Sequence, residues 1–209
     1  MRIITYYTKR RHLNQAIRMR DSIRDWGYDI SIYTDKWTRN QPEYQEHKDI
    51  FDTKRGAGYW AWKPMIILDA LKLDDEILYL DSSMIPVDSY GIRRIMDGTQ
   101  AVTTADDSIW IQRQWCKRDT FVLMGCDTEE YWNTPCIMAG ILFVKQAGKW
   151  FIEEWRDYCL NYRIISDQPS QENFPEFQDH RHDQAILCNL ATKYDVPRVK
   201  LQGEIIDRP

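Results

Sequence analysis

Asp81 is the residue whose type and position point most directly to chemistry. It follows the run EILYL at 76–80, and a nearly continuous apolar run of this kind is typical of a strand buried on both faces. An unpaired carboxylate at the end of such a strand is costly, so it needs a cation, a cluster of donors or water. The alternative interpretation is an aspartate that caps the following turn.

Phosphate binding by a glycine-rich loop is excluded, because the sequence contains neither GxxxxGK[ST] nor GxGxxG. Gly56-Ala57-Gly58 indicates only a short turn. A bound nucleoside diphosphate would therefore need a divalent cation, held by hard oxygen ligands such as carboxylates. This requirement again points to Asp81.

The elements that must position Asp81 alternate between strand and helix. Apolar runs predict strands at 2–8, 28–34, 76–80, 101–104, 137–144 and 196–201. Helical spacing of apolar residues predicts helices at 13–26, 65–71, 92–96, 149–162 and 182–192. The opening strand–helix–strand unit implies parallel pairing. We therefore expect a single α/β domain over 1–209, possibly one part of a longer polypeptide, with a mostly parallel central sheet flanked by helices.

Composition and charge narrow the class of protein. The 209 residues are 43% hydrophobic and 29% charged, which is ordinary for a globular chain, and a net charge of −4 argues against a nucleic-acid partner. The five cysteines form no CxxC pair, and an odd count favours a reducing compartment. The longest uncharged run, at 131–144, is too short to cross a bilayer. We expect a soluble cytoplasmic protein without a transmembrane segment.

Five segments, in this order, resemble the metal-dependent glycosyltransferases of the GT-A fold. They are residues 5–11, GYWAWKP at 58–64, ILYLDSS at 77–83, MAGILFV at 138–144 and HDQAIL at 182–187. The order and spacing are similar to the retaining family that has D-x-D, N-A-G and D-Q motifs. The overall size and the WKP segment also resemble compact glycosyltransferases of chlorella-infecting viruses, which decorate capsid glycans.

The resemblance implies a metal site at the end of the strand 76–80. Asp81 matches the first aspartate of D-x-D, which binds Mn²⁺ (or Mg²⁺) in the family. Ser83 stands where the second aspartate is expected, so the sequence has one anionic ligand fewer than the family pattern. Candidates for a third ligand are His182, Asp183 and Asp207.

The resemblance also implies a set of donor-binding and catalytic residues. Lys63 matches a basic side chain that touches the donor sugar and phosphate, and Asp183 with Gln184 matches the D-Q pair that acts at the sugar or the acceptor hydroxyl. The remaining candidates for the nucleotide-sugar site are Tyr7, Thr8, Arg11, Asp35, Ala139 and Gly140. Tyr7 would stack on the base, and Trp60 or Trp62 would face the ligand.

Each of these assignments has a structural alternative that the sequence leaves open. Lys63 can lie along the start of a helix, Asp183 can complement the helix dipole, and Ala139-Gly140 can serve close packing. His180 and His182 are expected at the surface. Asp106-Asp107 is expected in a solvated turn, with binding of an acceptor hydroxyl as the alternative, and Arg208 in a solvated tail or facing the diphosphate.

These observations together predict a glycosyltransferase that uses a UDP-sugar donor, Mn²⁺ (or Mg²⁺), and a glycan or glycoprotein acceptor. One alternative is a sugar-phosphate nucleotidyltransferase, although residues 5–12 contain no glycine to hold a triphosphate. The other is a non-catalytic carbohydrate-binding protein. Such modules are mostly β-sandwiches, which disagrees with the alternation of strands and helices.

Overall fold

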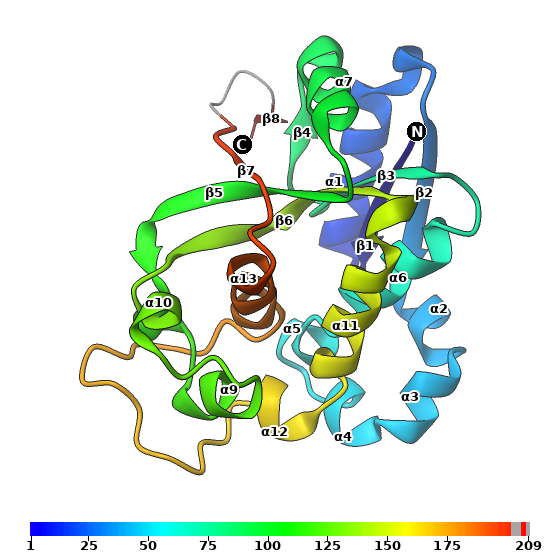
Figure 1. Ribbon diagram of the computed structural model, residues 1–209. Coiled ribbons are helices and arrows are strands. Elements are labelled where there is room, and N and C mark those ends of the chain that lie inside the picture. The colour runs from blue at the N-terminus through cyan, green and yellow to red at the C-terminus, as the bar shows by residue number, and fades with distance from the viewer. Residues whose placement is uncertain (202–205, 208–209) are drawn as a thin grey trace.

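A six-stranded sheet forms the centre of the computed structural model, which describes residues 1–201 and 206–207 (Figure 1). The strands in sheet order are β2 (Asp29–Thr34), β1 (Arg2–Tyr7), β3 (Glu76–Leu80), β6 (Pro135–Lys145), β5 (Val102–Ile111) and β7 (Arg198–Val199). Within this sheet β6 runs antiparallel to both of its neighbours, and the other described pairs are parallel. A separate antiparallel pair joins β4 (Ile85–Pro86) to β8 (Ile206–Asp207).

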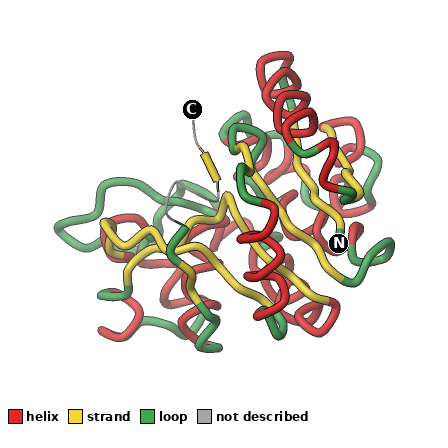
Figure 2. Tube along the Cα trace, turned by 90° about the horizontal axis from the view of Figure 1, so that it is seen from above, coloured by secondary structure: helices red, strands yellow, loops and turns green. Residues whose placement is uncertain are grey.

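Helices surround the sheet, as the view turned by 90° shows (Figure 2). The longer ones are α1 (Arg10–Ser22), α6 (Trp62–Ala70), α7 (Ser89–Gly98), α11 (Lys149–Cys159) and α13 (Asp183–Lys193). The shorter ones are η1 (Arg24–Trp26), α2 (Asp35–Arg39), α3 (Pro42–Glu46), α4 (Lys48–Phe51), α5 (Gly56–Tyr59), α8 (Gln112–Trp115), α9 (Arg118–Leu123), α10 (Glu129–Trp132), η2 (Gln146–Gly148) and α12 (Tyr162–Ile165). No described helix combines the length and apolar character needed to cross a membrane.

Both faces of the sheet are buried, which explains the continuous apolar runs. Alternate residues of one strand enter two different cores: Ile77 and Tyr79 face α6, α11 and α13, whereas Leu78 and Leu80 face α1 and α7. Successive side chains of a strand point to opposite faces, so helices on both sides require apolar residues at every position. The expected mostly parallel α/β sheet flanked by helices is confirmed.

Several predicted elements differ in their bounds. The predicted helix at 13–26 is α1 followed by the separate turn η1, which Gly27 ends in the left-handed conformation at φ 73°. The predicted strand at 101–104 continues as β5 to Ile111 across two register shifts. Asp106 therefore pairs with Ile137 inside a strand and does not lie in the expected solvated turn.

Candidate active site

Three charged side chains from distant parts of the chain meet where β3 ends. The Lys63 ammonium of α6 lies 2.9 Å from Asp183 Oδ2 and 3.7 Å from Asp81 Oδ1. Lys63 Nζ also donates a hydrogen bond of 3.1 Å to the carbonyl oxygen of Ala139 in β6. Lys63 is 4% exposed and Asp183 is 2% exposed, so this ion pair is screened from water. We call Lys63, Asp81 and Asp183 the charged cluster.

Burial sets the protonation behaviour of the charged cluster. Burial raises the pKa of Asp183 to about 6, although Lys63 acts in the opposite direction; the charge of Asp81 adds to the rise. Burial by itself lowers the pKa of Lys63, but the combined charges of Asp183 and Asp81 more than offset it and raise that pKa. Lys63 is therefore charged at neutral pH, and Asp183 titrates closer to neutrality than an exposed aspartate.

Asp81 is oriented by the strand that precedes it and by β6. The Tyr79 hydroxyl donates a hydrogen bond of 2.5 Å to Asp81 Oδ1, and the Asp81 backbone N–H donates one of 2.8 Å to the Gly140 carbonyl. A Cβ atom on Gly140 would lie 2.8 Å from Asp81 Oδ2 and 2.7 Å from Met84 Cε. The absence of a side chain at Gly140 is therefore what lets the Asp81 carboxylate lie against β6.

The start of α13 holds Asp183 and Gln184 in place. His182 precedes the helix with φ 47° and ψ −114°, a conformation that residues other than glycine rarely adopt. The Gln184 amide Nε2 donates a hydrogen bond of 2.7 Å to the Ile137 carbonyl, and the Trp155 indole N–H donates one of 3.0 Å to the Asp183 carbonyl. The N-cap position of α13 belongs to His182, which leaves the Asp183 side chain directed at Lys63.

A large cleft opens on one side of Asp81, with a cavity volume of about 890 Å³. Of the predicted site residues, Thr8, Asp35 and Ser83 line it together with Asp81. Tyr6 and Trp62 form part of its wall, with their rings stacked at 3.8 Å between centroids. We call this the large cleft, and its volume is in the range of small-molecule binding sites.

A smaller cleft of about 220 Å³ adjoins the large cleft, and Asp81 and Trp60 line both. The other predicted residues that line the small cleft are Lys63, Ala139, Gly140, Asp183 and Gln184. The structure thus brings together residues from β3, β6, α6 and α13 around one cavity. It also separates the two tryptophans, because Trp62 is 5% exposed and packs on Tyr6, whereas Trp60 borders both clefts.

Two predicted site residues are not placed in either cleft. Tyr7 lines neither of them; its neighbour Tyr6 lines the large cleft instead, because successive strand side chains point to opposite faces. Arg11 lies in α1, and its side chain is outside the described residues. A continuous apolar strand shows no alternation of polar and apolar residues. The sequence therefore could not tell which of Tyr6 and Tyr7 lines the large cleft.

His180 and His182 are buried, which corrects the expectation of surface histidines. His182 is 0% exposed and its Nδ1 lies 2.7 Å from the carbonyl oxygen of Ile165, while His180 Nε2 lies 3.1 Å from that of Ile164. Burial lowers the pKa of His182 to about 4, so its imidazole is neutral at pH 7. The two rings tie the segment before α13 to α12.

The described residues provide one carboxylate for a cation at the end of β3. No group of three or more histidine, cysteine, aspartate or glutamate side chains able to hold a metal occurs among them. Of the candidates for a third ligand, Asp183 Oδ2 lies 2.9 Å from Lys63 Nζ and His182 Nδ1 lies 2.7 Å from the Ile165 carbonyl oxygen, so each already has a protein partner. The side chain of Asp207, and the segment 208–209 with Arg208, are outside the described residues. A single carboxylate with Ser83 fits a Mg²⁺-like ion that takes its other ligands from substrate phosphates.

Sequence reasoning missed two residues that shape the charged cluster and its surroundings. Tyr79 lies two positions before Asp81, and a period-two reading of β3 would have placed it on the same face. Arg55 lines the small cleft and forms ion pairs with Asp167 and Asp179, the former at 3.2 Å. No local pattern around Arg55 signals partners that lie so far along the chain.

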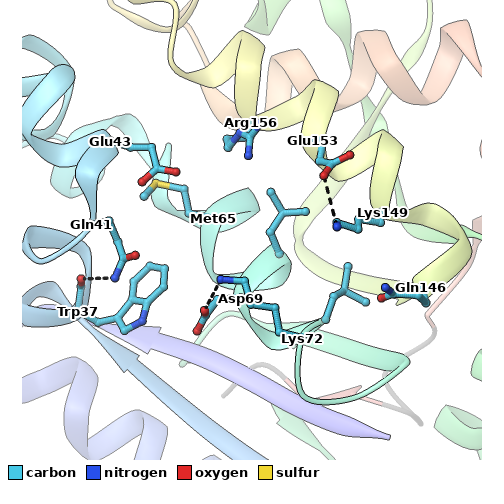
Figure 3. A pocket seen from close by; sticks show the side chains of 12 residues that line it. Trp37, Gln41, Glu43, Met65, Asp69, Lys72, Gln146, Lys149, Glu153 and Arg156 are labelled. Atoms are coloured by element: carbon cyan, nitrogen blue, oxygen red, sulfur yellow. Dashed lines mark hydrogen bonds and ion pairs between the residues drawn. The ribbon is translucent and has the colours of Figure 1, made fainter.

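A further cleft, of about 250 Å³, lies apart from the charged cluster (Figure 3). Residues of α2, α6 and α11 line it, including Trp37, Met65 and Glu153. Two ion pairs lie within its lining, Lys72–Asp69 at 3.0 Å and Lys149–Glu153 at 3.7 Å. None of the predicted site residues lines this cleft.

Comparison with solved structures identifies the fold. Mouse xyloside xylosyltransferase 1 in its apo form matches with a TM-score of 0.52 and 12% identity, covering 97% of this chain and 85% of that one. The apo structure of the bifunctional glycosyltransferase WbbM matches with a TM-score of 0.52 and 13% identity, covering 97% of this chain and 39% of that one. A glycosyltransferase involved in glycosylation of the PBCV-1 major capsid matches with a TM-score of 0.49 and 11% identity. The match covers 97% of this chain and 81% of that one.

The fold is therefore that of the GT-A glycosyltransferases, as the order of motifs predicted. At 12% and 13% sequence identity, these matches establish similarity of fold alone. No protein-family model matches the sequence, and no curated protein matches it.

Proposed function

We propose that the chain is a glycosyltransferase that moves a sugar from a UDP-sugar to a hydroxyl group of a glycan. The observation that carries the proposal is the charged cluster at the junction of the two clefts, at the ligand-binding edge of an α/β sheet. The nucleotide would occupy the large cleft and the donor sugar the small cleft. The cytoplasmic location, the glycan or glycoprotein acceptor and a viral origin remain predictions from the sequence.

The proposed reaction breaks the bond between the sugar C1 and the diphosphate oxygen and forms a bond from C1 to the acceptor oxygen. The acceptor hydroxyl gives up its proton, which the leaving diphosphate takes. Negative charge accumulates on the leaving diphosphate while C1 becomes cationic. The Asp183 carboxylate borders the small cleft, where it would favour positive charge at C1. The Gln184 side chain, fixed by the Ile137 carbonyl, would orient the sugar or the acceptor hydroxyl.

A divalent cation belongs to the same proposal. Asp81 and Ser83 would hold Mn²⁺ or Mg²⁺ together with oxygens of the donor diphosphate. Such an ion supplies Lewis-acid stabilisation of the leaving diphosphate. Tyr79 and Gly140 support this role, because together they fix the Asp81 carboxylate at the edge of the large cleft.

Calorimetry with UDP, GDP and CMP, each with and without Mn²⁺, tests the nucleotide and the metal together. We expect UDP to bind most tightly and Mn²⁺ to strengthen its binding. Equal affinities for all three nucleotides, unchanged by Mn²⁺, would contradict the proposal. Slow hydrolysis of a UDP-sugar in water would separate an enzyme from a carbohydrate-binding protein.

The variant Asp81→Asn tests the metal ligand. Asparagine keeps the shape of the side chain and removes the charge that attracts a hard cation. We expect the Mn²⁺-dependent part of the UDP affinity to disappear. The melting temperature should change little, since the Asp81 side chain is 34% exposed. If Asp81→Asn binds UDP with the same Mn²⁺ dependence as the wild type, the metal site lies elsewhere.

A further inference from the structure

Three side chains form a continuous row that leads out of the small cleft. The Arg181 guanidinium lies 4.1 Å from the centre of the Trp115 ring, and the Arg181 N–H donates a hydrogen bond of 2.9 Å to the Trp115 carbonyl. Trp110 meets Trp115 edge to face, with 5.0 Å between ring centroids. We call Arg181, Trp115 and Trp110 the aromatic row.

The outer end of the aromatic row is exposed. Trp110 is 38% exposed and the adjacent Ile109 is 75% exposed, whereas most large apolar side chains of this chain are buried. Trp110 lies near the end of β5 and Trp115 lies in α8, so secondary structure holds both. An exposed indole fixed in this way offers a flat apolar surface at low entropic cost.

The inner end of the aromatic row reaches the candidate active site. Arg181 lines the small cleft together with Gln184 and Asp183. A molecule that contacts Trp110 and Arg181 would therefore extend toward the charged cluster. The guanidinium supplies hydrogen-bond donors beside the apolar ring, which is the combination that a pyranose needs for its C–H face and its hydroxyl oxygens.

We propose that the aromatic row binds the saccharide acceptor, with its reactive hydroxyl directed into the small cleft. This inference rests on the proposed function, because it assumes that the small cleft holds the donor sugar. A saccharide is favoured over a protein partner because the aromatic row leads into a cavity through Arg181, where a sugar hydroxyl could enter. A basic stripe that would favour nucleic acid is lacking, given the net charge of −4.

The test compares Trp110→Ala with Trp150→Ala. Trp150 is a matched control, because it is 48% exposed and packs edge to face on Tyr194 at 4.8 Å, but lies on α11 away from the aromatic row. The probes are methyl glycosides of glucose, galactose, xylose, fucose and rhamnose, with binding followed by saturation-transfer NMR. We expect Trp110→Ala to weaken binding of the preferred glycoside about five- to tenfold, and Trp150→Ala to leave it unchanged.

A second variant and a second readout guard against misfolding and against failure of the proposed function. Trp110→Phe keeps an aromatic ring and should retain most of the binding. With a UDP-sugar present, Trp110→Ala should raise the acceptor KM and lower the ratio of transfer to donor hydrolysis. The inference is overturned if no glycoside binds the wild type, or if Trp110→Ala and Trp150→Ala bind glycosides equally. If the protein does not bind UDP but binds glycosides through Trp110, the proposed function is overturned and the aromatic row is a saccharide-binding surface.

Discussion

Two opposing effects act on the protonation of the Asp183 carboxylate. Its carboxylate is 2% exposed, which favours the neutral form, and it lies 2.9 Å from the Lys63 ammonium, which favours the charged form. The alternative role considered from sequence, a carboxylate that only complements the helix dipole, does not require a buried lysine beside it. The pairing with Lys63 instead places a titratable group beside the small cleft.

The variant Asp183→Asn should lose turnover and keep its affinity for UDP. Asparagine preserves the shape but removes negative charge from the place where the sugar C1 becomes cationic, so we expect a fall of about 10²-fold or more in UDP-sugar hydrolysis. UDP lacks the sugar that Asp183 would touch, so its titration should be unaltered. Unchanged turnover would reduce Asp183 to a structural partner of Lys63.

The same variant tests the pKa of Asp183 through the pH dependence of stability. The folded-state pKa of Asp183, about 6, lies above its ordinary value of 3.8, so the folded protein binds this proton more tightly than the unfolded chain does. Stability from this group is present at low pH and is lost as pH rises from about 4 to about 6. Relative to Asp183→Asn, the wild type should gain about 2 kcal/mol between pH 7 and pH 4, measured by urea unfolding. A pH-independent difference contradicts this pKa.

Lys63→Met should destabilise the fold strongly at neutral pH. It leaves the buried Asp183 carboxylate without its cation, which typically costs about 3–5 kcal/mol. Lys72→Met is the matched control, because Lys72 pairs with Asp69 at 3.0 Å but its side chain is 73% exposed, so its loss should cost less than about 0.5 kcal/mol. Urea unfolding of both variants measures the difference. Equal midpoints would show that the buried pair contributes no more than a surface pair.

At the scale of elements, β6 brings the two halves of the site together. It runs antiparallel between β3 and β5, and its residues 137–140 contact groups from three other elements. The Ala139 carbonyl accepts from Lys63, the Ile137 carbonyl accepts from Gln184, and Gly140 leaves room for Asp81. The backbone of one strand therefore sets the positions of side chains from β3, α6 and α13.

Gly140→Ala should damage binding more than stability. The added methyl would lie 2.8 Å from Asp81 Oδ2 and 2.7 Å from Met84 Cε; both are side-chain ends that can move, so the Asp81 carboxylate shifts. We expect Mn²⁺-dependent UDP affinity to fall, while the loss of stability stays at about 1 kcal/mol, the low end for an added core methyl, because both neighbours are side-chain ends. The control is Gly98→Ala, where nothing lies within 4 Å. A Gly140→Ala protein with wild-type UDP affinity would refute the role given to this close approach.

At the scale of the whole molecule, the long connection at 166–182 is fastened to the first third of the chain. Arg55, the N-cap residue of α5, pairs with Asp167 and with Asp179 near either end of that connection. The Lys117 ammonium donates a hydrogen bond of 3.0 Å to the Gln168 carbonyl. These contacts hold the segment that leads into His182 and Asp183, and hence the entry to the small cleft.

Arg55→Ala should loosen this connection. Without the guanidinium, Asp167 and Asp179 lose their shared cation, so amide hydrogen exchange at 166–179 should accelerate and donor turnover should fall. The control is Arg20→Ala, since Arg20 pairs only with its exposed neighbour Asp21 in the described structure. Exchange at 166–179 that is as slow in Arg55→Ala as in the control would show that other contacts hold the segment.

The sequence by itself determined the main strands of the central sheet and pointed to the end of one of them as the candidate site. The run 76–80 predicted a buried strand, and β3 has those bounds; Asp81 lies at its end, on the wall of both clefts. These features follow from local rules, because a strand buried on both faces must be apolar throughout and a carboxylate at its end must be satisfied. The alternation of strands and helices was sufficient to indicate the α/β class, and the order of the five motifs indicated the GT-A fold.

The tertiary structure decided which residues meet. The pairing of Lys63 with Asp183, the burial of His180 and His182, and the choice of Tyr6 over Tyr7 depend on strand order and on which helices cover each face. Partners that are far apart in sequence leave no periodic signal, and strands covered on both faces carry no alternation to show which side faces a ligand. The candidate site is therefore a product of long-range packing, and its contacts could not be predicted from the sequence.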